Sequence, residues 1–559
     1  MPKIEVKKKD LNRLLEKSFN DDELEKHLEC AKAELDDITD DMYKIELNDT
    51  NRPDLWTSAG IARQINQYLN LKKYSYSFFH KKSDHKIIVD KNIKNIRPFI
   101  VGFGVKEIKI DEDLLLELIQ NQEKFAQNFG KKRADIAIGI YKLDRIKFPI
   151  HYKAIKPESK KFIPLGEEKE LNLKEILIKH PKGIEYGSII KDHKEYPLIF
   201  DSNDNVLSLP PVINSRYIGE VETKDKDIFI ELTGTNLTNL LLVANIFAYD
   251  LVDRGCKIMP VEVEYPYDTD YKRSFIVPYD FNNSIKVNIG EFDNLVGFKP
   301  KPEDIKKNLN KMGYFNIKIE KEQLELSIPG YRNDIMHMVD IVEDYVIGNG
   351  YNNFQVKLPS EMTIGHLSLK EQFSDKLRDW AVGMGFQEVL SNILTSTENV
   401  YKKMDLEKKE GLQIANPMTE SYNILRNSII PGLLEMEATS AKSVYPHKIF
   451  EIGDVGKIDK NGTDGHKTSM NIGFLSAHPK TNFSEMRSYV DNIMYYAGID
   501  QFTLKPAVYK SLIKGRSAEI MFNGQCLGYF GEMDPNILEN WDINMPCSII
   551  EIFVNDLQK

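Results

Sequence analysis

Short runs of β-branched and aromatic residues alternate with helix-like segments along the whole chain, and this alternation most constrains the fold. Strand-like runs lie near residues 97–110, 134–143 and 227–232, and helix-like segments near 111–129 and 237–251. Beyond about residue 363, helices and strands follow an order that fits an antiparallel sheet with helices better than a β-α-β repeat. The pattern predicts a multidomain α+β protein.

A chain of 559 residues is long enough for three to five domains. Changes in the pattern predict four of them. We expect a small N-terminal α+β domain over residues 1–86 and a mixed α/β domain over 87–270. A third domain with strands and helices is expected over 271–356, and a larger one over 357–559.

The first domain has a regular apolar stripe. Asn20 is followed three residues later by Glu23, the spacing of a helix-starting capping box. Apolar residues then recur at spacings of three and four, which predicts one helix through Leu24, Leu28, Ala31, Leu35 and Ile38.

Composition excludes several classes of protein. The longest apolar stretch, Leu240–Ala248, contains Asn245, so no membrane span is expected. The four cysteines form no CxxC pair, which favours a reducing cytoplasm over a disulfide framework or a structural zinc site. A net charge of −10 argues against a protein that mainly grips a phosphate backbone. The common phosphate-loop, dinucleotide, zinc-protease and serine-hydrolase motifs are absent, so the chain has no self-contained catalytic motif.

An acidic cluster lies in residues 334–344. Asp340, Glu343 and Asp344 are three and four residues apart on an expected helix, with Asp334 near its start. Oxygen ligands of this kind suit Mg²⁺. A solvated acidic helix that begins at Asp334 is the alternative, because clusters of charge are usually solvated faces.

A second cluster lies where a strand meets a helix. Glu231 is surrounded by apolar strand residues, and Thr238 offers a hydroxyl group shortly after Gly234. Such a strand end can line a small-ligand pocket. Alternatively, Glu231 points to solvent and Asn236 caps the helix that begins at Leu237.

A third segment places Arg52 and Asp54 on either side of Pro53. It predicts a rigid hydrogen-bonded turn. The turn serves either as an interface or RNA contact, or as a buried structural element with Trp56 in the core.

Together these segments resemble the beta subunits of phenylalanyl-tRNA synthetases. The similarity covers residues 46–65, 207–238 and 328–354, and continues through 412–434 and 448–455 in the family's order. It implies that 87–270 is an editing-type domain, that 271–356 is a winged-helix-like domain, and that 357–559 is a non-catalytic class II synthetase-like module. An ATP-clamping arginine and a GxGxxxR-like segment are missing from 516–541.

The resemblance also implies partners and sites. Members form a cytoplasmic α₂β₂ enzyme that uses ATP and Mg²⁺ to attach phenylalanine to its tRNA, with activation in the alpha subunit. The family's Mg²⁺-associated acids match Asp334, Asp340, Glu343 and Asp344. Its tyrosine-removing pocket falls on the segment with Leu207, Ser215, Glu231, Asn236 and Thr238, where related archaeal-type sequences usually have Asp in place of Asn236.

The chain is similar to the archaeal/eukaryotic type of this subunit. It passes from Leu69 into the editing-type domain without room for the oligonucleotide-binding insert of bacterial forms. A non-catalytic scaffold or RNA-binding protein built from synthetase domains is the main alternative function. A stand-alone hydrolase of mischarged tRNA is another.

Overall fold

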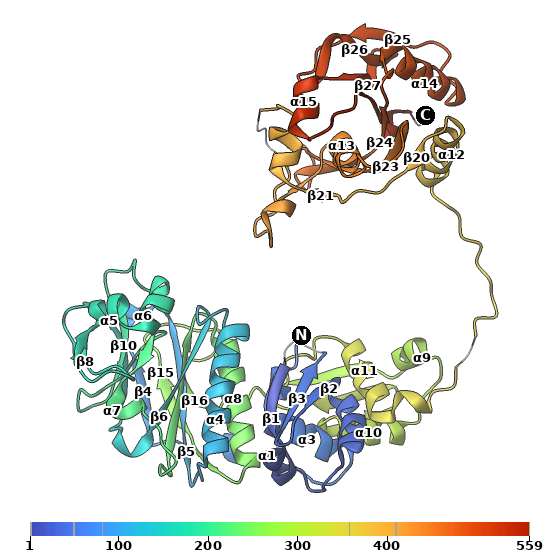
Figure 1. Ribbon diagram of the computed structural model, residues 1–559. Coiled ribbons are helices and arrows are strands. Elements are labelled where there is room, and N and C mark those ends of the chain that lie inside the picture. The colour runs from blue at the N-terminus through green and yellow to red at the C-terminus, as the bar shows by residue number, and fades with distance from the viewer. Residues whose placement is uncertain (1–2, 49–50, 81, 357, 408–410, 558–559) are drawn as a thin grey trace. The chain divides into compact units, whose positions relative to one another are not determined.

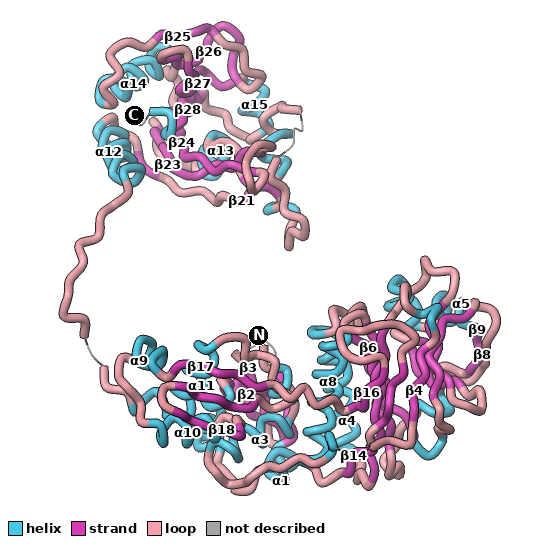
Figure 2. The backbone as a smooth tube through the Cα atoms, turned by 180° about the vertical axis from the view of Figure 1, so that it is seen from behind, coloured by secondary structure: helices cyan, strands magenta, loops and turns pink. Residues whose placement is uncertain are grey.

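The chain forms two compact units, Met1–Lys357 and Leu358–Lys559 (Figure 1). The structure is a computed structural model that describes residues 3–48, 51–80, 82–356, 358–407 and 411–557. Several sheets with flanking helices are present in the first unit and one large sheet in the second (Figure 2). The multidomain α+β prediction is confirmed.

An antiparallel sheet in the order β1-β3-β2 begins the first unit. Helix α2 (Asp21–Leu28) starts with the predicted capping box of Asn20 and Glu23. The predicted continuation of this helix to Ile38 is wrong, because Lys32 has a left-handed φ of 51° and the following residues form a strand paired with β3. The other elements are β1 (Lys3–Lys7), α1 (Lys8–Leu14), β2 (Ala33–Ile38), β3 (Met42–Leu47) and α3 (Ser58–Tyr68).

Two sheets form the middle of the first unit. One is antiparallel, in the order β14-β5-β13-β6, and consists of β5 (Phe99–Lys106), β6 (Ile136–Lys142), β13 (Ile228–Gly234) and β14 (Lys257–Met259). The other has seven strands in the order β12-β11-β10-β7-β4-β15-β16: β4 (Lys86–Val89), β7 (Ile150–Ile155), β10 (Tyr196–Phe200), β11 (Val206–Leu209), β12 (Ile213–Asn214), β15 (Val261–Glu264) and β16 (Ser274–Val277). Because β16 pairs with β15, this sheet extends beyond residue 270.

Helices cover these sheets. Helix α8 (Leu237–Asp253) contacts β5 and β13 and buries the longest apolar run of the sequence. Helix α4 (Glu112–Lys124) lies beside α8 (Figure 1), where Phe125 and Phe247 pack with ring centroids 5.6 Å apart. Shorter helices are α5 (Leu173–Lys179), α6 (Pro181–Tyr186) and α7 (Arg216–Gly219). No helix within the described ranges has both the length and the apolar character to cross a membrane.

A small sheet in the order β17-β19-β18 completes the first unit. Its strands are β17 (Ser284–Asn288), β18 (Phe315–Glu320) and β19 (Gln323–Ser327), with helices α9 (Gly290–Val296), α10 (Pro302–Lys311) and α11 (Met338–Asn349). Helices α10 and α11 pack against each other.

The second unit contains a seven-stranded sheet in the order β20-β23-β24-β28-β27-β26-β25. All neighbours are antiparallel except β20 and β23, as the sequence predicts. Alternate residues face opposite sides: Phe474 packs in one apolar cluster with α12 and α14, and Leu475 in another with α13 and α15. The elements are α12 (Leu369–Gly383), β20 (Gln387–Glu388), α13 (Ile430–Thr439), β23 (His447–Ile458), β24 (His466–Ala477), α14 (Phe483–Tyr496), β25 (Thr503–Pro506), β26 (Leu512–Phe522), β27 (Gln525–Met533), α15 (Pro535–Asn540) and β28 (Cys547–Phe553).

Candidate functional site

Glu231 occupies the middle of β13, between two strands that leave space beside it. Its cross-strand neighbours are Gly102 on β5 and Gly139 on β6. Tyr141, two residues after Gly139, lies on the same face of the sheet. A Cβ atom on Gly139 would lie 2.1 Å from Tyr141 Oη, so only glycine lets this ring approach Glu231.

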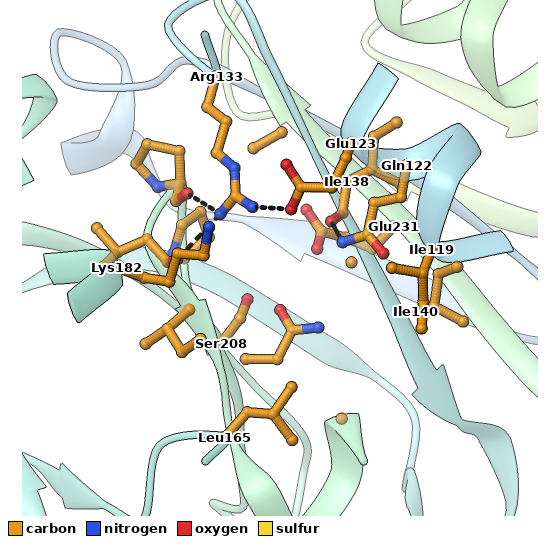
Figure 3. A pocket seen from close by; sticks show the side chains of 18 of the residues that line it. Ile119, Gln122, Glu123, Arg133, Ile138, Ile140, Leu165, Lys182, Ser208 and Glu231 are labelled. Atoms are coloured by element: carbon orange, nitrogen blue, oxygen red, sulfur yellow. Dashed lines mark hydrogen bonds and ion pairs between the residues drawn. The ribbon is translucent and has the colours of Figure 1, made fainter. Parts of the chain in front are cut away.

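A cavity of about 310 Å³ opens beside Glu231 (Figure 3). This volume lies at the lower end of the range of about 300–1,000 Å³ found for small-molecule sites. Its apolar wall comes from α4 and β6, including Leu118, Ile119, Ile138 and Ile140. Polar groups come from α4 as well as from other elements: Gln122, Ser208, Asn214, Glu231 and Thr233. The combination of an apolar wall with polar and charged groups suits an aromatic ligand that also carries polar substituents.

The carboxyl group of Glu231 is buried and almost without partners. Tyr141 Oη donates a hydrogen bond to Glu231 Oε2 over 2.8 Å, whereas Glu231 Oε1 is buried without a hydrogen-bond partner. Burial raises the pKa of Glu231 from 4.5 to about 8, partly offset by the Tyr141 hydrogen bond and by Arg97. The group is therefore mainly protonated at neutral pH.

Arg133 lies at the edge of the cavity. Its guanidinium group pairs with Glu123 over 2.6 Å, donates to the carbonyl oxygen of Val212 over 3.1 Å, and lies 4.2 Å from the Tyr186 ring centroid. The segment Lys131–Arg133 has φ angles of 48°, 54° and 68°, an unusual left-handed run for three side-chain-bearing residues. Neither this arginine nor Tyr141 was predicted from the sequence, because neither lies near Glu231 along the chain.

The other predicted pocket residues lie outside the cavity lining. Ser215 accepts a hydrogen bond from the Ile218 backbone N–H as the N-cap of α7. Asn236 caps α8 by accepting from the Asn239 N–H over 3.0 Å, as the capping alternative predicts. Thr238 Oγ1 accepts from Tyr271 Oη over 3.1 Å. Leu207 precedes the lining residue Ser208 and is itself buried. The structure thus places Glu231 in the cavity and the other four beside it.

The four acids predicted to bind Mg²⁺ have separate roles in this structure. Asp334 pairs with Arg332 over 2.5 Å, and Asp344 accepts from Arg332 and from Tyr314 Oη, both over 2.7 Å. Asp340 accepts hydrogen bonds from the backbone N–H groups of Met336 and His337, and Glu343 forms an ion pair with Lys32. Within the described ranges, no three His, Cys, Asp or Glu side chains are arranged to bind a metal ion. The quartet does not fit a common Mg²⁺ site here.

The turn at residues 52–54 is buried, as its structural interpretation predicts. Arg52 donates two hydrogen bonds of 2.8 Å to Asp54, and Trp56 lies in the core. Arg52 Nε also lies 3.8 Å from Asp334 Oδ1, so the turn forms an ion pair with the segment that precedes α11.

The second unit has a more polar cavity of about 680 Å³, lined in part by Ser391, Arg426 and Glu435. Arg426 is buried and bound to Glu451 over 2.5 Å, to Ser391 Oγ and to the Asp454 carbonyl oxygen. This arginine is therefore occupied by internal partners.

Comparisons with known proteins agree with this architecture. Residues 355–554 match the family model "Phenylalanyl tRNA synthetase beta chain CLM domain", and residues 285–351 match "tRNA synthetase B5 domain". The chain is 44% identical to a phenylalanine–tRNA ligase beta subunit of Borrelia recurrentis over the full length of both. It is 41% identical to that of Borreliella burgdorferi over all of this chain and 99% of the relative.

A solved structure is also similar. It is an N-terminal fragment of the phenylalanyl-tRNA synthetase beta subunit from Pyrococcus horikoshii, with 42% identity and a TM-score of 0.60. The match covers 63% of this chain and the whole fragment. Full-length identity above 40%, together with two family models, shows that this chain belongs to the phenylalanine–tRNA ligase beta subunit family.

Proposed function

We propose that this chain is the beta subunit of a cytoplasmic α₂β₂ phenylalanine–tRNA ligase and supports the attachment of phenylalanine to its tRNA. Full-length similarity to curated beta subunits supports this function. The alpha subunit performs amino-acid activation with ATP and Mg²⁺. Apolar side chains exposed on the second unit support docking of a partner: Leu369, Val382 and Leu390 are 74%, 61% and 75% exposed.

The second activity that we propose is hydrolysis of Tyr-tRNA in the cavity beside Glu231. Tyrosine differs from phenylalanine by one hydroxyl group, and an apolar synthetic site rejects such an isostere weakly. A second site that hydrogen-bonds the phenol discriminates in the opposite direction. The observation on which this proposal rests is the unpartnered, buried Glu231 Oε1 in a mostly apolar cavity.

A deacylation assay with the assembled holoenzyme tests the editing site. Removing one partner so that a buried polar group is left unsatisfied costs about 1–3 kcal/mol, so Glu231→Ala should slow Tyr-tRNA hydrolysis roughly fivefold to a hundredfold. Phenylalanine charging should stay near the wild-type rate. Equal rates of Tyr-tRNA hydrolysis by wild type and Glu231→Ala would show that Glu231 does not contribute to the reaction.

Two variants outside the cavity complete this experiment. Asn236→Asp keeps a helix-capping acceptor, and Thr238→Ala removes a hydroxyl bonded to Tyr271. Their effects on hydrolysis should be much smaller than that of Glu231→Ala. If either variant loses as much hydrolytic activity as Glu231→Ala, the residue that it replaces takes part in the reaction after all.

We also propose that the chain has the shorter archaeal/eukaryotic architecture, with domains near 1–86, 87–277, 278–356 and 357–559, where the second domain extends past the expected residue 270 to include β16 (Ser274–Val277). Only Leu69–His85 separate α3 from β4, which leaves no space for an inserted domain. The 42% identity to the Pyrococcus fragment supports this type, while the full-length Borrelia relatives are bacterial.

A further inference from the structure

Glu231 differs from other buried acids of the first unit in its surroundings. Asp250, Asp253 and Asp344 each lie beside an arginine with which they form an ion pair. Arg97, the cation that acts on Glu231 from a distance, instead donates to Thr233 Oγ1, the Thr233 carbonyl oxygen and the Ala134 carbonyl oxygen. Among the residues that the structure describes, the only hydrogen-bond donor to the Glu231 carboxyl group is Tyr141.

This arrangement favours a neutral carboxyl group. An unpaired carboxylate is costly in an apolar interior, so the group retains its proton instead. The pKa of Tyr141 is also raised well above its usual value by burial and by Glu231, so the phenol keeps its hydrogen and acts as the donor. Because Oε2 accepts from Tyr141, the acid proton belongs on Oε1, the oxygen without a protein partner.

We propose that Tyr141 is a positioning residue that fixes Glu231 as a neutral hydrogen-bond donor toward the ligand, and thereby selects an aromatic side chain with a hydroxyl group. The inference rests on the proposed editing function and specifies the direction of its key hydrogen bond. The phenol oxygen of tyrosine accepts from Oε1–H. A phenylalanine ring leaves this buried O–H without an acceptor, which disfavours the correct product in the hydrolytic site.

Space around the pair supports this role for Tyr141. Gly139 is the cross-strand neighbour of Glu231, and its missing side chain admits the Tyr141 hydroxyl group. Tyr141 is fully buried, and its Oη also lies 3.4 Å from Asn214 Oδ1, a lining residue of the cavity. The ring is thus fixed by the sheet on one side and by β12 on the other.

The direction of the hydrogen bond can be tested with Glu231→Gln in the holoenzyme. A glutamine offers Tyr141 an acceptor and the ligand an N–H donor, as a neutral glutamate does. We expect Glu231→Gln to retain much more Tyr-tRNA hydrolysis than Glu231→Ala. If Glu231 instead works as a carboxylate acceptor, the wild-type rate should rise as pH rises through about 8, and that result would overturn the inference.

A pH profile gives a second readout. The wild-type rate, corrected for uncatalysed hydrolysis, should fall as pH rises through about 8, since Glu231 then loses its donor proton. Glu231→Gln should lack this fall. The charged groups that also line the cavity are Glu123 and Arg133, which pair with each other, and Lys182 and Glu220 at its edge. Variants of these groups should leave the Glu231-dependent fall in place.

Tyr141→Phe tests the positioning role directly. Since the Tyr141 hydrogen bond lowers the pKa of Glu231, its loss should move the fall to higher pH and reduce the preference for Tyr-tRNA over Phe-tRNA roughly tenfold. Tyr265→Phe is the matched control, because Tyr265 is also buried but its hydroxyl group contacts the Ile100 backbone.

Binding of p-cresol and toluene to the same variants, measured by calorimetry, examines the cavity without the hydrolytic step. Wild type should prefer p-cresol, and Tyr141→Phe should weaken that preference. If Tyr141→Phe keeps the wild-type preference for p-cresol over toluene and also keeps the wild-type pH profile of hydrolysis, the inference is overturned. Absence of Tyr-tRNA hydrolysis with intact p-cresol preference would overturn the proposed editing function alone.

Discussion

Ionisation of Glu231 opposes folding, because the unfolded chain solvates the carboxylate and the cavity wall does not. Below pH 4.5 the group is protonated in both states. As pH rises, the unfolded state loses the proton first, while the folded state keeps it until about pH 8. The contribution of this proton to stability is complete below pH 4.5 and is lost as pH rises to about 8, by roughly 1.4 kcal/mol per pH unit.

Glu231→Gln should therefore gain stability relative to the wild type between pH 5 and pH 8, because glutamine does not ionise. Thermal unfolding of the full chain at both pH values measures this difference. Glu322→Gln, at an exposed carboxyl group, serves as the control. If the difference in stability between wild type and Glu231→Gln is the same at pH 5 and pH 8, the carboxyl group is not held protonated in the folded state.

Glu231 was a candidate because it is an acid inside an apolar strand, but this pattern left open whether it faces solvent, and only the family resemblance implied a pocket. It could not identify Tyr141, since that contact depends on the register between β6 and β13, which are far apart in the chain. Arg133 could not be predicted because the left-handed run Lys131–Arg133 contains no glycine, and Gly130 before it has an ordinary φ of −86°. Ser215, Asn236 and Thr238 lie near the pocket segment in sequence, but their side chains bond to helix ends or to Tyr271.

Two loop segments with similar sequences, Arg52–Asp54 and Arg332–Asp334, join distant elements of the first unit. Each arginine forms two hydrogen bonds with the aspartate two residues later. Arg332 also pairs with Asp344 on α11, so the network connects the turn after β3 with this helix. The Arg332 and Arg52 charges hold the pKa of Asp334 near 2, against burial that raises it.

Asp334→Asn should destabilise the first unit by about 3–5 kcal/mol, because it removes one partner of a buried ion pair. The stabilisation from Asp334 is present above pH 3.8 and is lost as pH falls through about 2. Unfolding measured with and without Mg²⁺ should give the same difference between variant and wild type.

Asp340→Asn is the matched control for this element. Asp340 accepts only from backbone N–H groups at the start of α11, so a loss of about 1 kcal/mol is expected. If Mg²⁺ stabilises the wild type and neither variant, the two carboxylates bind the metal, contrary to the expectation from their present partners.

Helix starts were more predictable than helix ends. The capping box at Asn20 depends on residues three apart, so the sequence alone located the start of α2. The apolar spacing continues beyond Leu28, yet Ala33–Ile38 pairs with β3, where Leu35 faces Ile45. A local periodicity cannot reveal that a strand partner is available, and tertiary pairing determined the outcome.

At the scale of the whole molecule, the second unit is built on one large sheet, and residues 355–554 match the phenylalanyl tRNA synthetase beta chain CLM domain. Helices cover both faces of the sheet, and the buried Arg426 is bound to Glu451. The class II likeness and the lack of catalytic motifs were visible in the sequence. The internal pairing of Arg426 was not, because β23 and residue 426 meet only in the folded chain.

The purified chain alone should therefore show no phenylalanine-dependent ATP–pyrophosphate exchange, and exchange should appear when the matching alpha subunit is co-expressed. Exposed apolar side chains on α12 and shortly after β20, including Leu369, Val382 and Leu390, are expected to become protected in that complex. Replacing Val382 and Leu390 by aspartate should weaken assembly and reduce exchange in parallel, whereas Glu231→Ala should leave both near wild type. Robust exchange by the single chain would overturn the assignment of activation to the partner. A stable monomer that never binds an alpha subunit would favour a scaffold derived from synthetase domains.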